Sequence, residues 1–180
     1  ITCSRGQDYQ LPVAIGALSA NRAIYSIGIG ASVDEIGKVW SNAIANPIAP
    51  LEVSEAPCQE VVIDSGLEGE GKGLDYLPIP ISTPGFDSAP YFTATGCISR
   101  NPETGVQNMG TYRAGLKSST RMAVRMSVRS GGAEGHLHWL EYKKRGEKMP
   151  MAIMLGGPPS VCYCAPQKLQ LGVDEIAVAG

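Results

Sequence analysis

The stretch from Arg121 to Arg129 alternates between apolar and polar side chains. Its methionines and valines fall on one face of an extended chain, and its three arginines fall on the opposite face. Period-two spacing of this kind is typical of a strand with one buried face and does not suit a helix. Because one strand needs hydrogen-bonded neighbours, the stretch predicts a sheet.

Glycine and proline occur often enough to exclude long helices, with 22 glycines and 13 prolines among 180 residues. Apolar runs between these breaks predict further strands over residues 57–64, 91–100, 106–116 and 151–155. The tight turn expected at residues 101–105 would join the middle two as a hairpin. Strands without βαβ alternation favour an α+β fold with an antiparallel barrel or sandwich.

Two helices are expected between these strands. Ser32 and Glu35 have the spacing of a capping box, and apolar residues follow from Ile36 with helical periodicity until Pro47 ends the pattern. A second helix is expected over residues 135–145, with Gly146 as its stop.

Composition limits the kind of protein. Hydrophobic residues make up 43% and charged residues 18% of the chain, and the net charge is −2. These values predict a soluble globular chain that spans no membrane, binds no nucleic acid and takes a small ligand. The proline-rich stretch 77–84 predicts a boundary between an N-terminal α/β segment, 1–84, and a domain over 85–180.

The five cysteines and the chain ends carry two further expectations. An odd number of cysteines without a secretory signal predicts reduced thiols in the cytoplasm, with Cys162 and Cys164 too close together to form a zinc site alone. A chain that starts at Ile1 and stops at Gly180 suggests a fragment of a longer protein.

Two glycine-rich stretches resemble nucleotide-binding loops only in part. Residues 66–73 nearly match the phosphate-binding loop, but Gly73 stands where a magnesium-binding hydroxyl is needed and Pro78 opposes a following helix. Gly28 and Gly30 lack the third glycine of a dinucleotide-binding turn. We therefore interpret residues 66–73 as a solvated loop.

Four polar residues remain open to more than one interpretation. His136 and His138 lie two apart on the expected helix, so they point in different directions and suit ordinary polar positions better than one shared metal. Glu175 lies among apolar residues and is either a helix cap or a buried carboxylate that needs a cation. Arg113, in a strand otherwise poor in charge, could bind an anion or simply lie on a sheet surface.

Taken in order, five segments resemble the UbiD decarboxylase family over nearly the whole chain. The block from Asn101-Pro-Glu-Thr-Gly to Asn108-Met-Gly-Thr-Tyr-Arg113 is the most specific, and the others begin at Pro57, Leu77, Met149 and Gly172. The resemblance implies a split β-barrel related to flavin reductases, with a few helices. It also implies that this barrel binds prenylated FMN.

In that family the cofactor phosphate is held through a divalent metal, usually manganese, with a monovalent cation such as K⁺ alongside. The resemblance carries the metal ligands over to Asn108 and Glu175, and Mg²⁺ is an alternative because the ligands are oxygens. The third ligand is a histidine in many members, and here the sequence departs from the pattern. His136 is preferred, with His138 and Glu134 as alternatives. The remaining cofactor-binding residues implied by the resemblance are Met109, Gly110, Thr111, Tyr112 and Arg113.

The resemblance also implies an activity. Arg113 matches the catalytic arginine that meets the substrate carboxylate, so we expect a non-oxidative, reversible decarboxylase of aromatic, heteroaromatic or α,β-unsaturated acids. Its partners would be a small carboxylic acid, CO₂ and a flavin prenyltransferase that supplies the cofactor. The glutamates that pair with this arginine, and the C-terminal domain expected to form a homo-oligomer, lie beyond Gly180 in the family. The alternative is a flavin-binding subunit without catalysis that needs a partner chain.

Overall fold

The computed structural model describes residues 9–17, 20–129 and 132–180. Contacts divide the chain into two compact units, which are described separately. The first unit combines residues 1–13, 51–93 and 113–125, and the second combines residues 14–50, 94–112 and 126–180. The proline-rich stretch predicts a boundary at residue 84 between two segments that are each continuous in sequence, whereas these two units are discontinuous. The boundary therefore stays a prediction.

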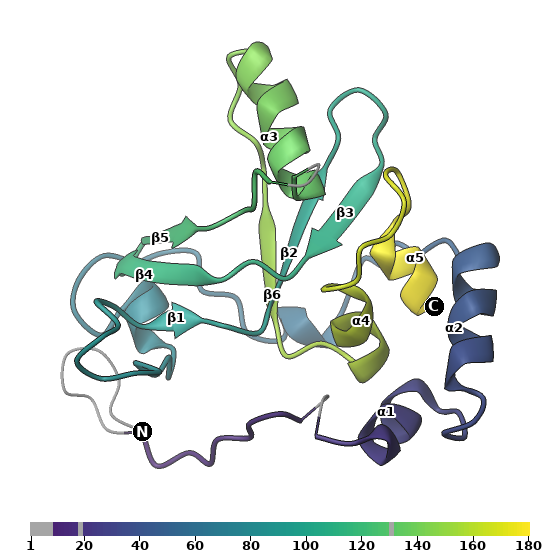
Figure 1. Ribbon diagram of the computed structural model, residues 1–180. Helices are drawn as coiled ribbons and strands as arrows, with labels where there is room; N and C mark the ends of the chain where they lie inside the picture. The colour runs from purple at the N-terminus through teal and green to yellow at the C-terminus, as the bar shows by residue number, and fades with distance from the viewer. Residues whose placement is uncertain (1–8, 18–19, 130–131) are drawn as a thin grey trace. The chain divides into compact units, whose positions relative to one another are not determined.

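The first unit contains a three-stranded antiparallel sheet in the order β1-β4-β5 (Figure 1). One face of the sheet carries the buried residues Phe92, Ala114 and Leu116, which pack with the partly buried Met122 and Val124. The other face carries arginine and lysine side chains. The elements of this unit are the 3-10 helices η2 (Pro57–Gln59) and η3 (Gly73–Tyr76) and the strands β1 (Tyr91–Phe92), β4 (Ala114–Ser118) and β5 (Arg121–Val124).

The second unit contains the other sheet, with the order β3-β2-β6 and antiparallel pairing throughout (Figure 1). Its strands are β2 (Thr95–Arg100), β3 (Gln107–Gly110) and β6 (Ala152–Leu155). Its helices are α1 (Arg22–Ile29), α2 (Ile36–Ala45), α3 (Glu134–Lys144), α4 (Pro159–Cys164) and α5 (Glu175–Ala179). Helix α3 contacts β2 and β3, and helix α5 contacts β3.

The predicted hairpin is confirmed as β2 and β3. The Asn101 side-chain oxygen accepts hydrogen bonds from the N–H groups of Glu103, at 2.8 Å, and Thr104, at 3.1 Å. Gly105 has a φ of +74°, a left-handed conformation that glycine adopts without a Cβ clash. This turn sets the register in which Ser99 lies opposite Asn108.

Both predicted helices are confirmed, with one correction at an end. Helix α2 begins after Glu35, whose side chain accepts a 2.6 Å hydrogen bond from the Ser32 hydroxyl and caps no backbone N–H. The predicted capping box therefore does not form. Helix α3 has Glu134 in its first turn and two lysines in its last turn, a distribution that complements the helix dipole.

Several predicted strands need correction. The strand over 57–64 is wrong: the chain forms η2 there, and Val61, Val62 and Ile63 are 74%, 70% and 60% exposed. These three residues favour strands, but no neighbouring strand is present among the described residues for them to pair with. The predicted strand 91–100 divides into β1 and β2, and the predicted strand 106–116 divides into β3 and β4; in each case the two parts belong to different sheets. The strand predicted over 121–129 stops at Val124. Strand β6 is only partly buried, because its ends are exposed.

The fold is α+β with two antiparallel sheets, and the finer expectation of a split barrel stays a prediction. Cys58, Cys97, Cys162 and Cys164 are free thiols, whereas Cys3 lies outside the described residues. Among the described helices none combines the length and the apolar character needed to cross a membrane.

The fold generates a prediction at Gly73, whose φ is +54°. A Cβ there would overlap the Ser119 carbonyl oxygen and lie 2.6 Å from that of Leu67. Gly66 has a similar φ of +62° with no atom near its Cβ position, so Gly66→Ala isolates the backbone strain of about 1–2 kcal/mol. We expect Gly73→Ala to lower the free energy of unfolding by a further ~1–3 kcal/mol, measured by urea unfolding. Equal losses in the two variants would contradict the close approach at Gly73.

Candidate functional site

A cavity of about 290 Å³ lies in the second unit. Its volume is near the lower end of the range typical of ligand pockets. It is lined mainly by residues 108–112 of β3 and the segment after it, by 132–134 at the start of α3, by 165–169 after α4, and by Glu175. The structure therefore brings together six of the seven residues predicted to bind the cofactor, and Arg113 is the exception.

The hairpin register positions Asn108 in this cavity. Asn108 lies opposite Ser99, and directly opposed residues of an antiparallel pair point to the same face of the sheet. Helix α3 covers that face, since the Ser99 hydroxyl lies 3.0 Å from His138 Nδ1. Asn108 is 3% exposed, and its amide Nδ2 makes no hydrogen bond of good geometry among the described residues. The Asn108 side chain nevertheless lies beside the Tyr112 hydroxyl: burial raises the pKa of Tyr112, and the contact with Asn108 opposes that rise.

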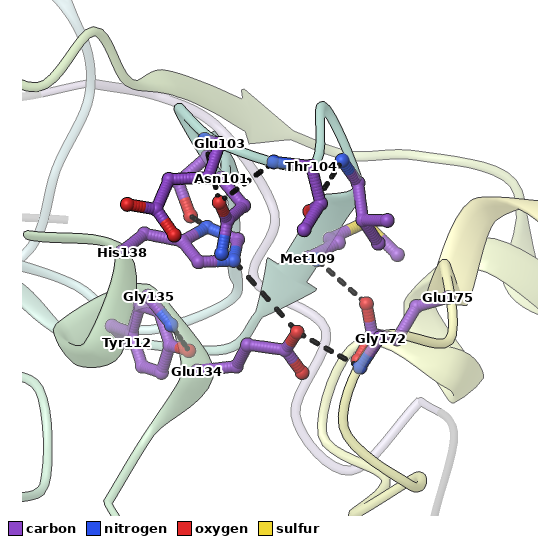
Figure 2. A network of polar contacts seen from close by, with 12 residues as sticks. Asn101, Glu103, Thr104, Met109, Tyr112, Glu134, Gly135, His138, Gly172 and Glu175 are labelled. Carbon is purple, nitrogen blue, oxygen red and sulfur yellow. Dashed lines mark hydrogen bonds and ion pairs between the residues drawn. The ribbon is translucent and has the colours of Figure 1, made fainter. Parts of the chain in front are cut away.

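Glu175 connects the start of helix α5 to strand β3 (Figure 2). Asp174 caps the helix by accepting a 2.8 Å hydrogen bond from the Ile176 N–H, which places Glu175 at the first helical position. The Glu175 Oε2 atom accepts a 2.7 Å hydrogen bond from the Met109 N–H. Strand β3 is an edge strand, so this N–H points away from the sheet and needs such a partner.

Burial changes the protonation of this carboxyl. Glu175 is 4% exposed, and burial raises its pKa to about 7, with the charges of Glu134 and Asp174 acting in the same direction. The Met109 N–H acts in the opposite direction but does not offset the burial. Without a cation nearby, the ionised form of Glu175 is therefore destabilised at neutral pH.

Glu134 is a second carboxylate that lines the cavity (Figure 2). Its Oε1 atom accepts a 3.1 Å hydrogen bond from the Gly172 N–H and lies 3.7 Å from His138 Nε2. Burial raises its pKa as well. Glu134 and Glu175, which are 41 residues apart in the sequence numbering, thus bring two partly desolvated acids to one cavity.

The two histidines differ in their surroundings. His138 is 1% exposed, and burial lowers its pKa, so it is held as the neutral imidazole at neutral pH. His136 stacks on Trp139, with ring centroids 5.5 Å apart. Neither imidazole belongs to the residues that line the cavity. The expectation that they point in different directions is confirmed.

Tyr112 lines the cavity and is hydrogen-bonded to the start of helix α3 (Figure 2). Its hydroxyl accepts a 3.3 Å hydrogen bond from the Gly135 N–H in the first turn of α3. Its carbonyl oxygen accepts hydrogen bonds from the Thr95 hydroxyl and, at 3.7 Å, from the Cys97 thiol. A side chain at Gly110 would overlap the Tyr112 ring, so glycine is required where the ring crosses the strand.

Arg113 lies in the first unit, beside a separate hollow of about 260 Å³. The Arg113 carbonyl accepts a 3.1 Å hydrogen bond from the Arg125 N–H, which pairs the ends of the two strands. Lys117 and Arg125 line the same hollow, and no acidic side chain does. None of these three cations forms an ion pair within the part of the chain that the structure describes. The hollow is therefore suited to an anion.

The sequence analysis missed the neighbours of two candidate site residues, Ser99 beside Asn108 and the two cations beside Arg113. Strand geometry could have indicated both. Counting outward from the turn at 101–105 places Ser99 opposite Asn108. The period-two pattern likewise places Lys117 on the same strand face as Arg113, and Arg125 on the polar face of the next strand. Only the pairing of the strands shows that these positions meet.

The cavity contains oxygen-bearing side chains of the kind that divalent cations bind. In the described ranges there is no group of three or more His, Cys, Asp and Glu side chains that could hold a metal. Oxygen-bearing side chains that line the cavity include the carboxylates of Glu134 and Glu175 and the amides of Asn108 and Gln167. A buried amide and two desolvated acids suit a hard cation.

Comparisons with known proteins identify the family of the chain. Residues 50–180 match the family described as the 3-octaprenyl-4-hydroxybenzoate carboxy-lyase Rift-related domain, UbiD. Among solved structures, an evolved dimeric form of the UbiD-class enzyme HmfF from Pelotomaculum thermopropionicum, in complex with prFMN, matches with a TM-score of 0.80 and 25% identity. The match covers 91% of this chain and 36% of that one.

Two further structures show the same fold at lower identity. The apo 3,4-dihydroxybenzoic acid decarboxylase AroY of Klebsiella pneumoniae matches with a TM-score of 0.73 and 21% identity, over 92% of this chain and 34% of that one. The vanillic acid decarboxylase of Sedimentibacter hydroxybenzoicus in closed form matches with a TM-score of 0.77 and 18% identity, over 91% and 35%. The chain thus spans about a third of the length of the structures it matches.

The site generates a prediction about pH. Because the pKa of Glu175 in the folded protein is raised from 4.5 to about 7, its contribution to stability is fully present below pH 4.5 and is lost as the pH rises through about 7. In chelator, the wild-type unfolding free energy should therefore fall between pH 4.5 and 8 by on the order of 3 kcal/mol more than that of Glu175→Gln. Glu141→Gln, a change on α3 at a partly exposed carboxylate that pairs with Lys144 and does not line the cavity, should keep the wild-type profile. Parallel profiles for wild type and Glu175→Gln would contradict the raised pKa.

Proposed function

Since the chain belongs to the UbiD carboxy-lyase family, we propose that it is the cofactor-binding part of a non-oxidative, reversible decarboxylase. The substrate class is an aromatic, heteroaromatic or α,β-unsaturated carboxylic acid, and the cofactor is prenylated FMN. The observation that carries the proposal is the cavity in which Asn108, Glu175 and the backbone of residues 109–112 come together. The prFMN complex of HmfF supports the choice of cofactor.

The cavity residues would hold the cofactor through its phosphate. Asn108 and Glu175 would bind a divalent cation, Mn²⁺ or Mg²⁺, that neutralises the phosphate, with a monovalent cation alongside. Arg129 and Lys168 line the same cavity and add positive charge for an anionic group. When bound, the prenylated flavin would supply a sink for the electron pair left as carbon dioxide departs.

The protein residues would orient the reacting groups and balance their charges. Tyr112, held by the Gly135 N–H and by Thr95, keeps its part of the cavity lining in one position. Arg113 would bind the substrate carboxylate with two parallel hydrogen bonds, which its planar guanidinium can donate. The hollow of Arg113, Lys117 and Arg125 supports this role because it is cationic and lacks an acidic neighbour.

The proposed metal link predicts a joint loss. Glu175→Gln removes the charge of one ligand, so metal and flavin occupancy should fall together after co-expression with a flavin prenyltransferase. Metal content by mass spectrometry and flavin content by absorption test this, with Glu141→Gln as the matched control. Unchanged occupancy of both in Glu175→Gln would overturn the link between the metal and the cofactor phosphate.

The proposed role of Arg113 predicts that its geometry matters as well as its charge. Arg113→Lys keeps the charge but loses the planar fork, so turnover of the acid should fall roughly 10- to 100-fold with flavin content unchanged. The assay uses the protein expressed from its complete gene, and Arg100→Lys, an exposed change on β2, is the control. Near-normal turnover would mean that charge alone suffices. Loss of flavin with activity would assign Arg113 to cofactor binding instead, and no turnover in the wild type would favour a non-catalytic flavin-binding subunit.

A further inference from the structure

Glu134 occupies a position in the cavity that neither histidine reaches. It begins helix α3 and lines the cavity together with Asn108 and Glu175. Its side chain is 15% exposed, and the Gly172 N–H holds its Oε1 atom at 3.1 Å. The other carboxylate oxygen, Oε2, has no hydrogen bond within the described part of the chain and is available to a ligand.

His138 lies between Ser99 of strand β2 and the Glu134 carboxylate. Its Nδ1 atom lies 3.0 Å from the Ser99 hydroxyl, and its Nε2 atom lies 3.7 Å from Glu134 Oε1 (Figure 2). The contact with Ser99 orients the imidazole, and its buried Nε2 atom, which has no hydrogen-bond partner among the described residues, lies next to the Glu134 carboxylate. Since residues i and i+4 of a helix share one face, Glu134 and His138 lie on the side of α3 that faces the sheet.

Asn108 supplies an observation that is independent of the two acids. Its amide is 97% buried, lines the same cavity and leaves Nδ2 without a hydrogen bond of good geometry among the described residues. A 180° rotation of the amide exchanges Nδ2 with Oδ1, so the same position can present an oxygen to a cation.

We propose that Glu134 is the third protein ligand of the divalent-metal site, in place of His136 or His138, and that the site is an all-oxygen set. Asn108 and Glu175 are the other two ligands. This inference rests on the proposed function, because it assigns a ligand within the metal site proposed there. Two carboxylates and an amide oxygen form a hard ligand set with a charge of −2.

An all-oxygen set has a consequence for metal selectivity. Carboxylate and carbonyl oxygens suit Mg²⁺, Ca²⁺ and Mn²⁺, whereas imidazole suits Zn²⁺ and Ni²⁺. A site with Glu134 therefore discriminates less in favour of Zn²⁺ and Ni²⁺ than a site with a histidine at this position. The variant Glu134→His provides the direct comparison.

The test measures binding of Mn²⁺ alone to the metal-free chain, by the electron paramagnetic resonance signal of free Mn²⁺. Even outer partners of metal ligands are worth roughly 10- to 100-fold in affinity, so Glu134→Gln should weaken Mn²⁺ binding at least about tenfold. Glutamine keeps the size of the side chain and can still accept from the Gly172 N–H. His136→Ala and the matched carboxylate control Glu141→Gln should bind Mn²⁺ as the wild type does.

A second variant keeps the test decisive if Glu134→Gln is poorly folded. Glu134→His should raise the Ni²⁺-to-Mn²⁺ affinity ratio at least about tenfold over the wild type, because it replaces an oxygen ligand by imidazole. An unchanged ratio, or a Mn²⁺ affinity lost in His136→Ala and kept in Glu134→Gln, would overturn the assignment of Glu134.

The outcomes also separate this inference from the proposed function. If Glu175→Gln loses Mn²⁺ while Glu134→Gln keeps it, the metal site stands and only the third ligand is wrong. If the wild-type chain binds no Mn²⁺, both the site and the inference fail.

Discussion

The hydrogen bond from the Met109 N–H to the Glu175 carboxylate is the contact on which the cavity depends. It joins residues 66 positions apart and satisfies an edge-strand N–H that would otherwise be buried without a partner. Leaving such a donor and acceptor unpaired would cost about 1–3 kcal/mol for each group. The contact therefore fixes the start of α5 against β3, and with it the position of Glu175 in the cavity lining.

This arrangement is not what stability alone would favour. A carboxylate with a pKa of about 7 that shares a cavity with a second partly buried acid opposes folding at neutral pH unless a cation is present. The surrounding contacts offset this cost: Asp174 caps α5, Gly172 holds Glu134, and Tyr112 ties the cavity lining to α3. Conflict between local stability and charge placement is characteristic of a binding site.

Local sequence patterns predicted the elements whose stabilising contacts are themselves local. The hairpin formed as expected because Asn101 and Gly105 satisfy the turn within five residues. Helix α3 ended near Gly146, which has a φ of +68° and needs no side-chain contact to stop the helix. The strand expected over 57–64 failed because a strand needs partners, and Val61 to Ile63 find none. The strand predicted over 106–116, the second arm of the hairpin, divided because β3 and β4 belong to different sheets, which periodicity cannot reveal.

The candidate site likewise contains residues that the sequence predicted and a residue that only the structure places. The sequence by itself predicted Asn108, Glu175 and Arg113 as site residues, because their type and their place in an ordered series of segments carry the resemblance to a family. It left open which of Glu134, His136 and His138 lies beside them, since all three fall within five consecutive residues. Only the tertiary structure decided this point. The hairpin register directs Ser99 toward α3, where Ser99 contacts His138. With the helix in this orientation Glu134 lines the cavity, and His136 stacks on Trp139 instead. The physical reason is that the rotation of a helix about its axis is set by what its buried side chains contact, and those contacts come from strands distant in the sequence.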